Sequence, residues 1–288
     1  KIPADSAIID DEEAVSIIAD YRNEDEEGVT RDFNRYKGYQ TIIFFQHFIY
    51  QMEHQHPWKY YLHPESFTDD DREAIKQICK SQKREYNEQA VIDIYHHAQQ
   101  YMDEPNVPGL DAKTADRIRV LLWKMYYAGC YAQYKEENHL LDFEDLLLKT
   151  YDIYSTDDTC KRYKWIQVDE VQDLNGMQLA IIDLLTVKDN PMVMYLGDEQ
   201  QAIFSFMGAK VETLTLLKMR CKGNIHHLQR NHRSPKYLLD VFNDYAEKQL
   251  KIDRELLPAS DNDVKAKPED LRIIHSSTID SERQEVTD

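Results

Sequence analysis

Glycine is scarce in this sequence, with eight residues among 288, and none of the eight is followed by lysine. A phosphate-binding loop of the form G-x-x-x-x-G-K-S/T needs two spaced glycines, whose backbone N–H groups surround the phosphates, and a lysine directly after the second. The composition therefore excludes such a loop within these 288 residues.

Cysteine is also rare, and long apolar runs are missing. Cys79, Cys130, Cys160 and Cys221 form no C-x-x-C pair, which argues against a disulfide framework or an iron–sulfur site and favours a reducing, cytoplasmic compartment. No apolar stretch approaches the ~20 residues that span a bilayer, and no signal peptide is visible, so no membrane partner is expected. The chain does not begin with Met, and we expect it to be a segment of a longer polypeptide.

Positive charge is in deficit, because 35 Lys and Arg face 53 Asp and Glu, giving a net charge of −18 at pH 7. A protein that coats nucleic acid normally presents a basic face that neutralises phosphates. Any contact with DNA must therefore be local, through base stacking and a few cations. Apolar residues make up 42% of the chain and charged residues 31%, which is typical of a globular protein.

Residues 1–160 have the apolar periodicity of helices. The pattern predicts helices from about residue 10 to 21, over 41–52, over 69–103 as one long helix or two in tandem, over 112–138, and from 142 onward. The segment PNVPG at 105–109 is predicted to interrupt the helical region.

From residue 164 onward, strands and helices alternate. Strands are predicted at 165–168, 192–196, 225–228 and 271–275, helices at 177–185, 211–219 and 235–250, and a polar loop at 253–267. Alternation of this kind is typical of a parallel sheet covered by helices.

The strand predicted at 165–168 ends in two acids, Asp169 and Glu170. Open α/β sheets bind ligands outside the carboxyl ends of their strands. One aspartate there can hold a hard cation such as Mg²⁺ beside the phosphates of a nucleotide. The adjacent glutamate can orient or deprotonate a water that attacks the terminal phosphate. The dipeptide alone also fits the plain start of a loop, and this alternative stays open at this point.

Four segments of the second half carry longer motifs. They are LDFEDLL at 141–147, DEVQDLNGMQ at 169–178, LGDEQQAIFSFMGA at 196–209 and LQRNHRS at 228–234. In the same order they resemble D-F-x-D/E-L-L, D-E-x-Q-D-x-N/T-x-x-Q, G-D-x-x-Q-S-I-Y-x-F/W-R-G-A and L-x-x-N-Y-R-S of UvrD/Rep-type superfamily I DNA helicases. Residues 140–245 carry this resemblance, whereas the first 140 residues match the family only in helical character and length.

The resemblance implies roles for five residues at a nucleotide site. Asp169 would hold Mg²⁺ beside bound ATP, and Glu170 would activate the attacking water. Gln201 would contact the γ-phosphate, and Arg233 would act as an arginine finger in cis. His232 stands where the family has a tyrosine that stacks on the adenine. For Gln201 and Arg233, a plain surface role is the alternative.

The resemblance also implies a DNA contact, with Phe204 and Phe206 stacking on bases of single-stranded DNA. Because alternating aromatics also suit a half-buried strand, core packing is the alternative for this pair. The sequence departs from the family pattern at Met207, which replaces an arginine and removes a cationic contact. Besides His232, the residues at 199–200 replace an acidic pair, and nothing in the sequence explains that change.

The expected fold is α/β: part of the parallel sheet of a P-loop NTPase (RecA-like) with an all-α inserted domain. Residues 1–160 would form the helical insertion of the first motor half. Residues 161–229 would form the C-terminal part of the first RecA-like motor domain, and residues 230–288 the start of the second.

The resemblance implies that the parent protein is an ATP-dependent DNA helicase that translocates 3′→5′ on single-stranded DNA and unwinds duplex. Its cofactors would be ATP and Mg²⁺. Its partners would be single-stranded or partly duplex DNA, the rest of the motor polypeptide, and repair or recombination proteins of the bacterial nucleoid. The chain alone is expected to be inactive. The alternatives are a helicase subunit of a RecB/AddA-like helicase–nuclease, or a non-catalytic DNA- or protein-binding module with a degenerate motor fold.

Overall fold

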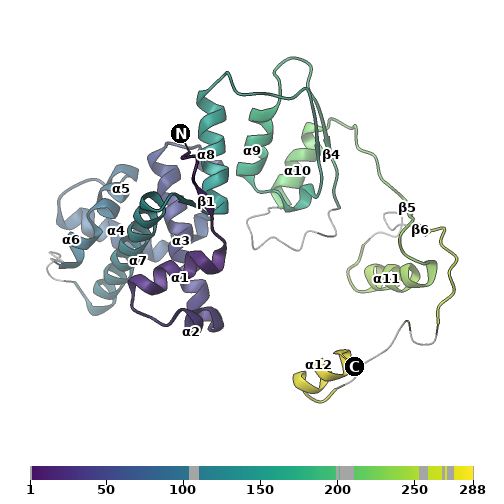
Figure 1. Ribbon diagram of the computed structural model, residues 1–288, viewed down its shortest axis with the longest axis horizontal. Coiled ribbons are helices and arrows are strands. Elements are labelled where there is room, and N and C mark those ends of the chain that lie inside the picture. The colour runs from purple at the N-terminus through teal and green to yellow at the C-terminus, as the bar shows by residue number, and fades with distance from the viewer. Residues whose placement is uncertain are drawn as a thin grey trace. The chain divides into compact units, whose positions relative to one another are not determined.

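The computed structural model describes residues 2–103, 110–198, 201, 211–252, 259–267, 270 and 276–287 (Figure 1). The chain divides into two compact units, Lys1–Leu217 and Lys218–Asp288. Phe204, Phe206 and Met207, together with the strand predicted at 271–275, lie outside the described residues. The three-part domain division drawn from the sequence stays a prediction.

Helices dominate the described part of the first unit, and short parallel strands accompany them. In chain order the elements are β1 (Ala7–Ile8), α1 (Asp11–Tyr21), α2 (Glu26–Arg31), α3 (Phe33–Glu53), η1 (Trp58–Tyr60), η2 (Pro64–Ser66), α4 (Asp69–Ser81), α5 (Glu88–His96), α6 (Ala98–Asp103), α7 (Ala112–Glu137), β2 (Leu140–Leu141), α8 (Phe143–Thr156), β3 (Trp165–Val168), η3 (Val171–Asp173), α9 (Gly176–Leu185), β4 (Met192–Tyr195) and α10 (Val211–Arg220). The second unit contains β5 (Arg230–Asn231), α11 (Lys236–Lys248), β6 (Ala259–Ser260) and α12 (Ile279–Thr287).

Side-chain caps fix where several helices begin. Asp10 accepts hydrogen bonds from the N–H groups of Glu12 and Glu13 at 3.0 and 2.9 Å, and the Glu13 carboxylate accepts the Asp10 N–H. This capping box satisfies amides that have no partner in the first turn of α1. The helix predicted from residue 10 is confirmed.

The segment predicted as one or two helices over 69–103 forms three, and the chemistry of the junctions explains the difference. After α4, Lys83 takes a left-handed backbone with φ 53°. The Asn87 side chain then accepts the Ala90 N–H at 2.9 Å and starts α5 as a separate helix. The helix predicted at 41–52 is longer than expected, because Asp32 caps α3 and the helix runs for 21 residues from Phe33 to Glu53.

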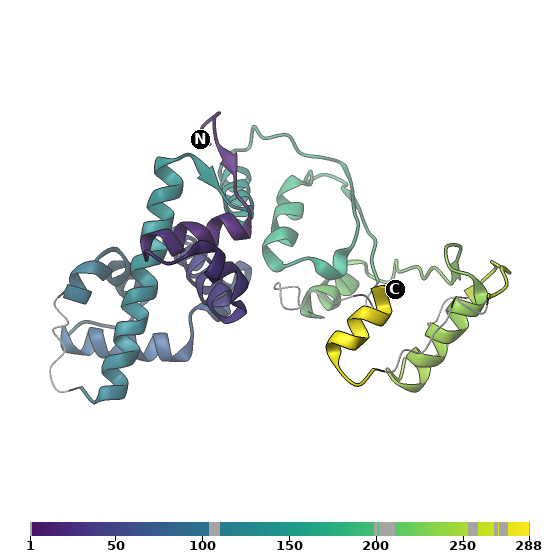
Figure 2. The ribbon, with the colours of Figure 1, turned by 60° about the horizontal axis from the view of Figure 1, so that its bottom comes forward.

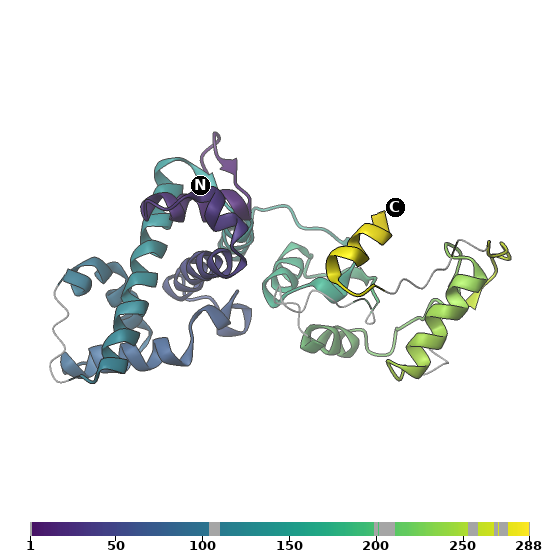
Figure 3. The ribbon, with the colours of Figure 1, turned by 90° about the horizontal axis from the view of Figure 1, so that it is seen from below.

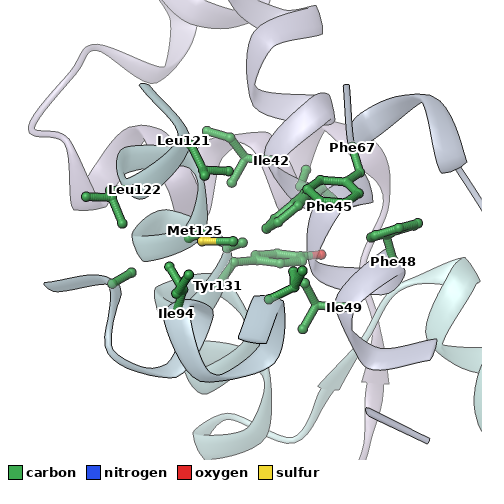
Figure 4. Close-up of a cluster of buried hydrophobic side chains, with 14 of the residues drawn as sticks. Ile42, Phe45, Phe48, Ile49, Phe67, Ile94, Leu121, Leu122, Met125 and Tyr131 are labelled. Carbon is green, nitrogen blue, oxygen red and sulfur yellow. The ribbon is translucent and has the colours of Figure 1, made fainter. Parts of the chain in front are cut away.

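The helical core is built around α7, which contacts α1, α3, α4, α5 and α6 (Figure 2). Phe45 from α3 and Leu121 and Met125 from α7 are fully buried, and the labelled core side chains converge between these helices (Figure 4). Tyr131 belongs to the same cluster, although its hydroxyl donates to Asp142 at 2.7 Å.

The predicted parallel pairing is present between β3 and β4, which run in register from Trp165 opposite Met192 to Val168 opposite Tyr195. A small apolar cluster from η3, α9 and α10 packs against Val168 and Tyr195. Two further parallel pairs, β1–β2 and β5–β6, complete the strand pairing within the described ranges. The fold is therefore mixed, helical with small parallel sheets, and the larger RecA-like sheet stays a prediction.

In the second unit, β5 pairs in parallel with β6, and α11 contacts β6 (Figure 3). The strand predicted at 225–228 is wrong, because this segment is not extended ladder in the structure and has no partner among the described residues. Pairing of the second unit starts only at Arg230. The loop predicted at 253–267 contains β6, whose Ala259 N–H donates to the Gln229 carbonyl at 2.9 Å. Among the helices that the structure describes, none is long and apolar enough to cross a membrane.

Candidate functional site at the carboxyl edge of β3 and β4

Two loops leave the carboxyl ends of β3 and β4 side by side. The Leu196 N–H donates to the Val168 carbonyl at 2.8 Å, and the Val171 N–H donates to the Leu196 carbonyl at 3.0 Å. These bonds extend the ladder beyond both strands. The loop with Asp169 and Glu170 is thereby tied to the loop that leads to Gln201.

The acidic pair sits on a sharp backbone turn. Glu170 adopts the left-handed region with φ 52° and ψ 42°, and its N–H donates to Asp169 Oδ1 at 2.9 Å. This conformation costs a residue with a Cβ about 1–2 kcal/mol, and such strain gathers at functional sites. The turn takes the chain from β3 into η3 and leaves both carboxylates exposed.

A buried amide connects the acidic pair to the next loop. Gln172, 3% exposed, donates from Nε2 to Glu170 Oε2 at 2.6 Å and accepts the Asp198 N–H at Oε1 at 3.1 Å. Gly197 makes room for this amide, because a Cβ at that position would lie 2.5 Å from Gln172 Oε1 and 2.8 Å from a methyl of Val171.

The position of Gln201 is set by Asp198. The Gln201 N–H donates to the Asp198 carbonyl at 3.0 Å, and its side-chain Nε2 donates to Asp198 Oδ2 at 2.9 Å. Asp169, Glu170 and Gln201 are thus brought to the same sheet edge. Gln172 and Asp198, which lie between them, were given no role from the sequence, although both stand inside recognised motifs.

Two other predicted site residues belong to the second unit. His232 and Arg233 are exposed in the turn between β5 and α11. Asn231 shapes this turn, since its Oδ1 accepts the N–H groups of Arg233 and Ser234 at 2.9 and 2.8 Å. The predicted DNA-contacting pair, Phe204 and Phe206, cannot be placed, because it lies outside the described residues.

The motif at 141–147 has a structural explanation. Asp142 caps α8, and its buried carboxylate accepts bonds from Lys135 Nζ at 2.7 Å and Tyr131 Oη at 2.7 Å, with His47 Nε2 at 2.9 Å. Burial raises the pKa of Asp142, but His47 and then Lys135 outweigh it and hold the pKa well below its usual value. This cluster joins α3, α7 and α8 inside the first unit.

The chain belongs to the UvrD/Rep helicase family. The model of the UvrD/REP helicase N-terminal domain matches residues 2–222. The family resemblance seen in the motifs is confirmed.

The matched relatives are bacterial helicases. A probable DNA helicase II homolog of Mycoplasma genitalium is 33% identical over 141 residues, which cover 44% of this chain and 20% of that protein. DNA helicase II of Haemophilus influenzae is 28% identical over 134 residues, 45% of this chain and 18% of that protein. The ATP-dependent DNA helicase PcrA of Staphylococcus aureus is 31% identical over 124 residues, 41% and 17% respectively. The match thus spans about a fifth of the length of these relatives.

Proposed function

We propose that the protein to which this chain belongs is an ATP-dependent DNA helicase, and that the carboxyl edge of β3 and β4 is part of its ATP-hydrolysing site. The observation that carries the proposal is the juxtaposition of Glu170 and Gln201 on adjacent loops of a chain from the UvrD/Rep family. A base and an amide donor at one sheet edge suit attack of water on a terminal phosphate.

In the proposed reaction, the Glu170 carboxylate accepts a proton from water as the water oxygen bonds to the γ-phosphorus. The bond from that phosphorus to the β–γ bridging oxygen breaks, and ADP and phosphate are released. Gln201 contacts a γ-phosphate oxygen, and Arg233 and His232 are the nucleotide-contacting residues of the second motor domain. These roles follow from the motifs and from general phosphoryl-transfer chemistry.

Asp169 fits the Mg²⁺ that ATP carries, because its carboxylate is exposed at the sheet edge and hard cations prefer oxygen ligands. When bound, the ion would neutralise phosphate charge. We propose single-stranded or partly duplex DNA as the partner, with Phe204 and Phe206 stacking on its bases and movement in the 3′→5′ direction. We expect the protein to act in the bacterial cytoplasm on the DNA of the nucleoid.

The test is Glu170→Gln in the full-length protein. We expect the DNA-stimulated rate of phosphate release to fall about 100-fold or more, since general-base catalysis contributes roughly that much. Nucleotide binding should be retained, because the substitution keeps size and shape. Glu136→Gln, an exposed position in α7, is the matched control and should keep the rate. Near-normal turnover in the Glu170 variant would refute the assignment.

The second candidate is a non-catalytic DNA- or protein-binding module with a motor-like fold. The methionine at position 207, where the family has an arginine, favours it, because it removes a cationic contact from the motif. A full-length protein that binds single-stranded DNA but releases no phosphate from ATP would decide for this candidate. For the 288-residue chain by itself, we expect no phosphate release under either proposal.

A further inference from the structure

We propose that Gln172 is a positioning residue that couples the catalytic base Glu170 to the loop of Gln201. The inference rests on the proposed function, because it assigns no new reaction. Through this residue, the two catalytic loops would act as one unit.

The coupling is a continuous series of hydrogen bonds. Gln172 Nε2 donates to Glu170 Oε2 at 2.6 Å, and Gln172 Oε1 accepts the Asp198 N–H at 3.1 Å. Asp198 Oδ2 in turn accepts from Gln201 Nε2 at 2.9 Å. Two intermediate residues therefore connect the base on one loop to the amide on the next.

The orientation of the Gln172 amide is fixed by its partners. If the amide were turned over, its oxygen would face the Glu170 carboxylate and its nitrogen would face the Asp198 N–H, so both contacts would become repulsive. The amide is almost fully buried, and a buried amide without its partners is costly. The side chain can thus hold one oxygen of Glu170 in one place.

Gly197 is an independent sign that this arrangement is built into the chain. The closest atom that a Cβ at position 197 would meet is Gln172 Oε1, at 2.5 Å, and the next belong to Val171, at 2.8 and 3.1 Å. Those distances are too short for any side chain without a shift of Gln172 or of the η3 backbone. The glycine therefore allows the two loops to approach through this amide.

At the other end of the series, Asp198 orients Gln201 through one hydrogen bond from its side-chain amide. A side-chain amide nitrogen carries two N–H groups, so the bond to Asp198 is compatible with a second bond to a phosphate oxygen. A shift of Gln201 would move the Asp198 loop, and through Gln172 it would alter how Glu170 is held. Binding of a phosphate at Gln201 would in this way change the position of the Glu170 carboxylate.

The experiment uses steady-state ATP hydrolysis by the full-length protein with single-stranded DNA. Gln172→Met removes both bonds at similar volume. We expect kcat to fall about 10- to 100-fold, as for other residues that orient a catalytic group, while the KM for ATP stays within about threefold. Gly197→Ala, which disturbs the same amide from the other side, should give the same split between kcat and KM.

Gln178→Met is the matched control. The substitution removes a partly buried hydrogen bond in the same motif, in which Gln178 Oε1 accepts the Asn175 N–H at 2.9 Å. Gln178 does not belong to the series of bonds from Glu170 to Gln201. Its kcat should match the wild type, although its thermal stability should fall as in the Gln172 variant. Equal loss of kcat in both would mean that general destabilisation is the cause, and would overturn the proposal.

A double-mutant cycle gives the second readout. In the Gln172→Met background, Gln201→Ala should reduce kcat much less than it does alone, because the coupled unit is already broken. Additive effects would overturn the inference. Wild-type kcat in Gln172→Met beside an inactive Glu170→Gln would also overturn it and leave the proposed function standing, whereas an active Glu170→Gln would remove the proposed function itself.

Discussion

Replacing Lys135 by methionine should lower the unfolding free energy of the helical region far more than replacing a surface residue. Lys135 is the lysine of a buried acidic cluster. Its Nζ lies 2.7 Å from Asp142 Oδ2, 2.6 Å from Asp145 Oδ2 and 3.2 Å from Gln46 Oε1. The lysine is 4% exposed. Methionine has a similar volume, so the change removes the charge and leaves little cavity.

The size of the effect follows from what is left behind. Asp142 keeps its bonds to His47 and Tyr131, but the Asp145 carboxylate keeps the Asp142 N–H at 3.2 Å and, more distantly, His47 Nε2 at 3.8 Å. Removing one partner of a buried ion pair costs about 3–5 kcal/mol. For a unit of this size each kcal/mol lowers the melting temperature by roughly 2–4 °C, so a fall of about 6–20 °C is expected.

The loss of stability should shrink in acid. In the wild type, the lowered pKa of Asp142 contributes stability above the unfolded pKa, and this is lost as pH falls through the folded value. In Lys135→Met, Asp142 loses one of the two cations that hold its pKa down, so burial raises the native pKa of this carboxyl relative to the wild type. The cost is then present near pH 7 and is relieved as pH falls toward 4.

The assay is chemical denaturation of this chain at pH 7 and at pH 4.5, with Lys113→Met as the control. Lys113 is exposed near the start of the same helix, and its replacement should change the unfolding free energy by less than about 0.5 kcal/mol. Equal stability of Lys135→Met and Lys113→Met at pH 7, or a deficit that grows on acidification, would show that the cluster is not an ion-pair network.

Two further outcomes are expected. His63 stacks on Phe44. Burial opposes its charge, but the hydrogen bonds that it donates to the carboxylates of Glu144 and Glu65 raise its pKa to about 9, so NMR titration should find it protonated at pH 7. Its stabilising contribution, up to about 3 kcal/mol, is complete below the unfolded pKa near 6.5 and is lost as pH rises through 9, and a flat unfolding free energy from pH 6 to 9.5 would contradict this. Asp10→Ala removes the cap of α1 and should destabilise the chain by about 1 kcal/mol in thermal unfolding, whereas Asp10→Asn should cost less.

The sequence pattern predicts an element correctly where neighbouring residues determine its bounds. The strand from Trp165 to Val168 was predicted with its observed bounds, because a short apolar segment is followed directly by two acids. The pairing of Ala7–Ile8 with Leu140–Leu141 was not predicted, since each strand has two residues and its partner lies more than a hundred positions away. Such contacts are set by the packing of the helices between them, which periodicity does not contain.

At the carboxyl edge of β3 and β4 as well, some residues could be predicted from the sequence and others could not. Asp169 and Gln201 could be singled out because a strand end and a motif place each of them. Gln172 could not, since its importance depends on burial and on a bond to the backbone of Asp198, 26 positions later. A polar residue in a short turn has many possible partners, and only the paired strands bring this one within reach.

The acidity of the chain, which argued against a broad DNA-binding face, is partly explained by folding. Asp25, Asp32 and Asp111 each accept an N–H at the start of a helix, as Asp10 and Asp142 do, and a carboxylate at that end is also favoured by the helix dipole. These acids would be needed in a helical region whatever it binds. The net charge of −18 therefore does not by itself weigh against the proposed DNA partner, which needs only a local surface for stacking and a few cations.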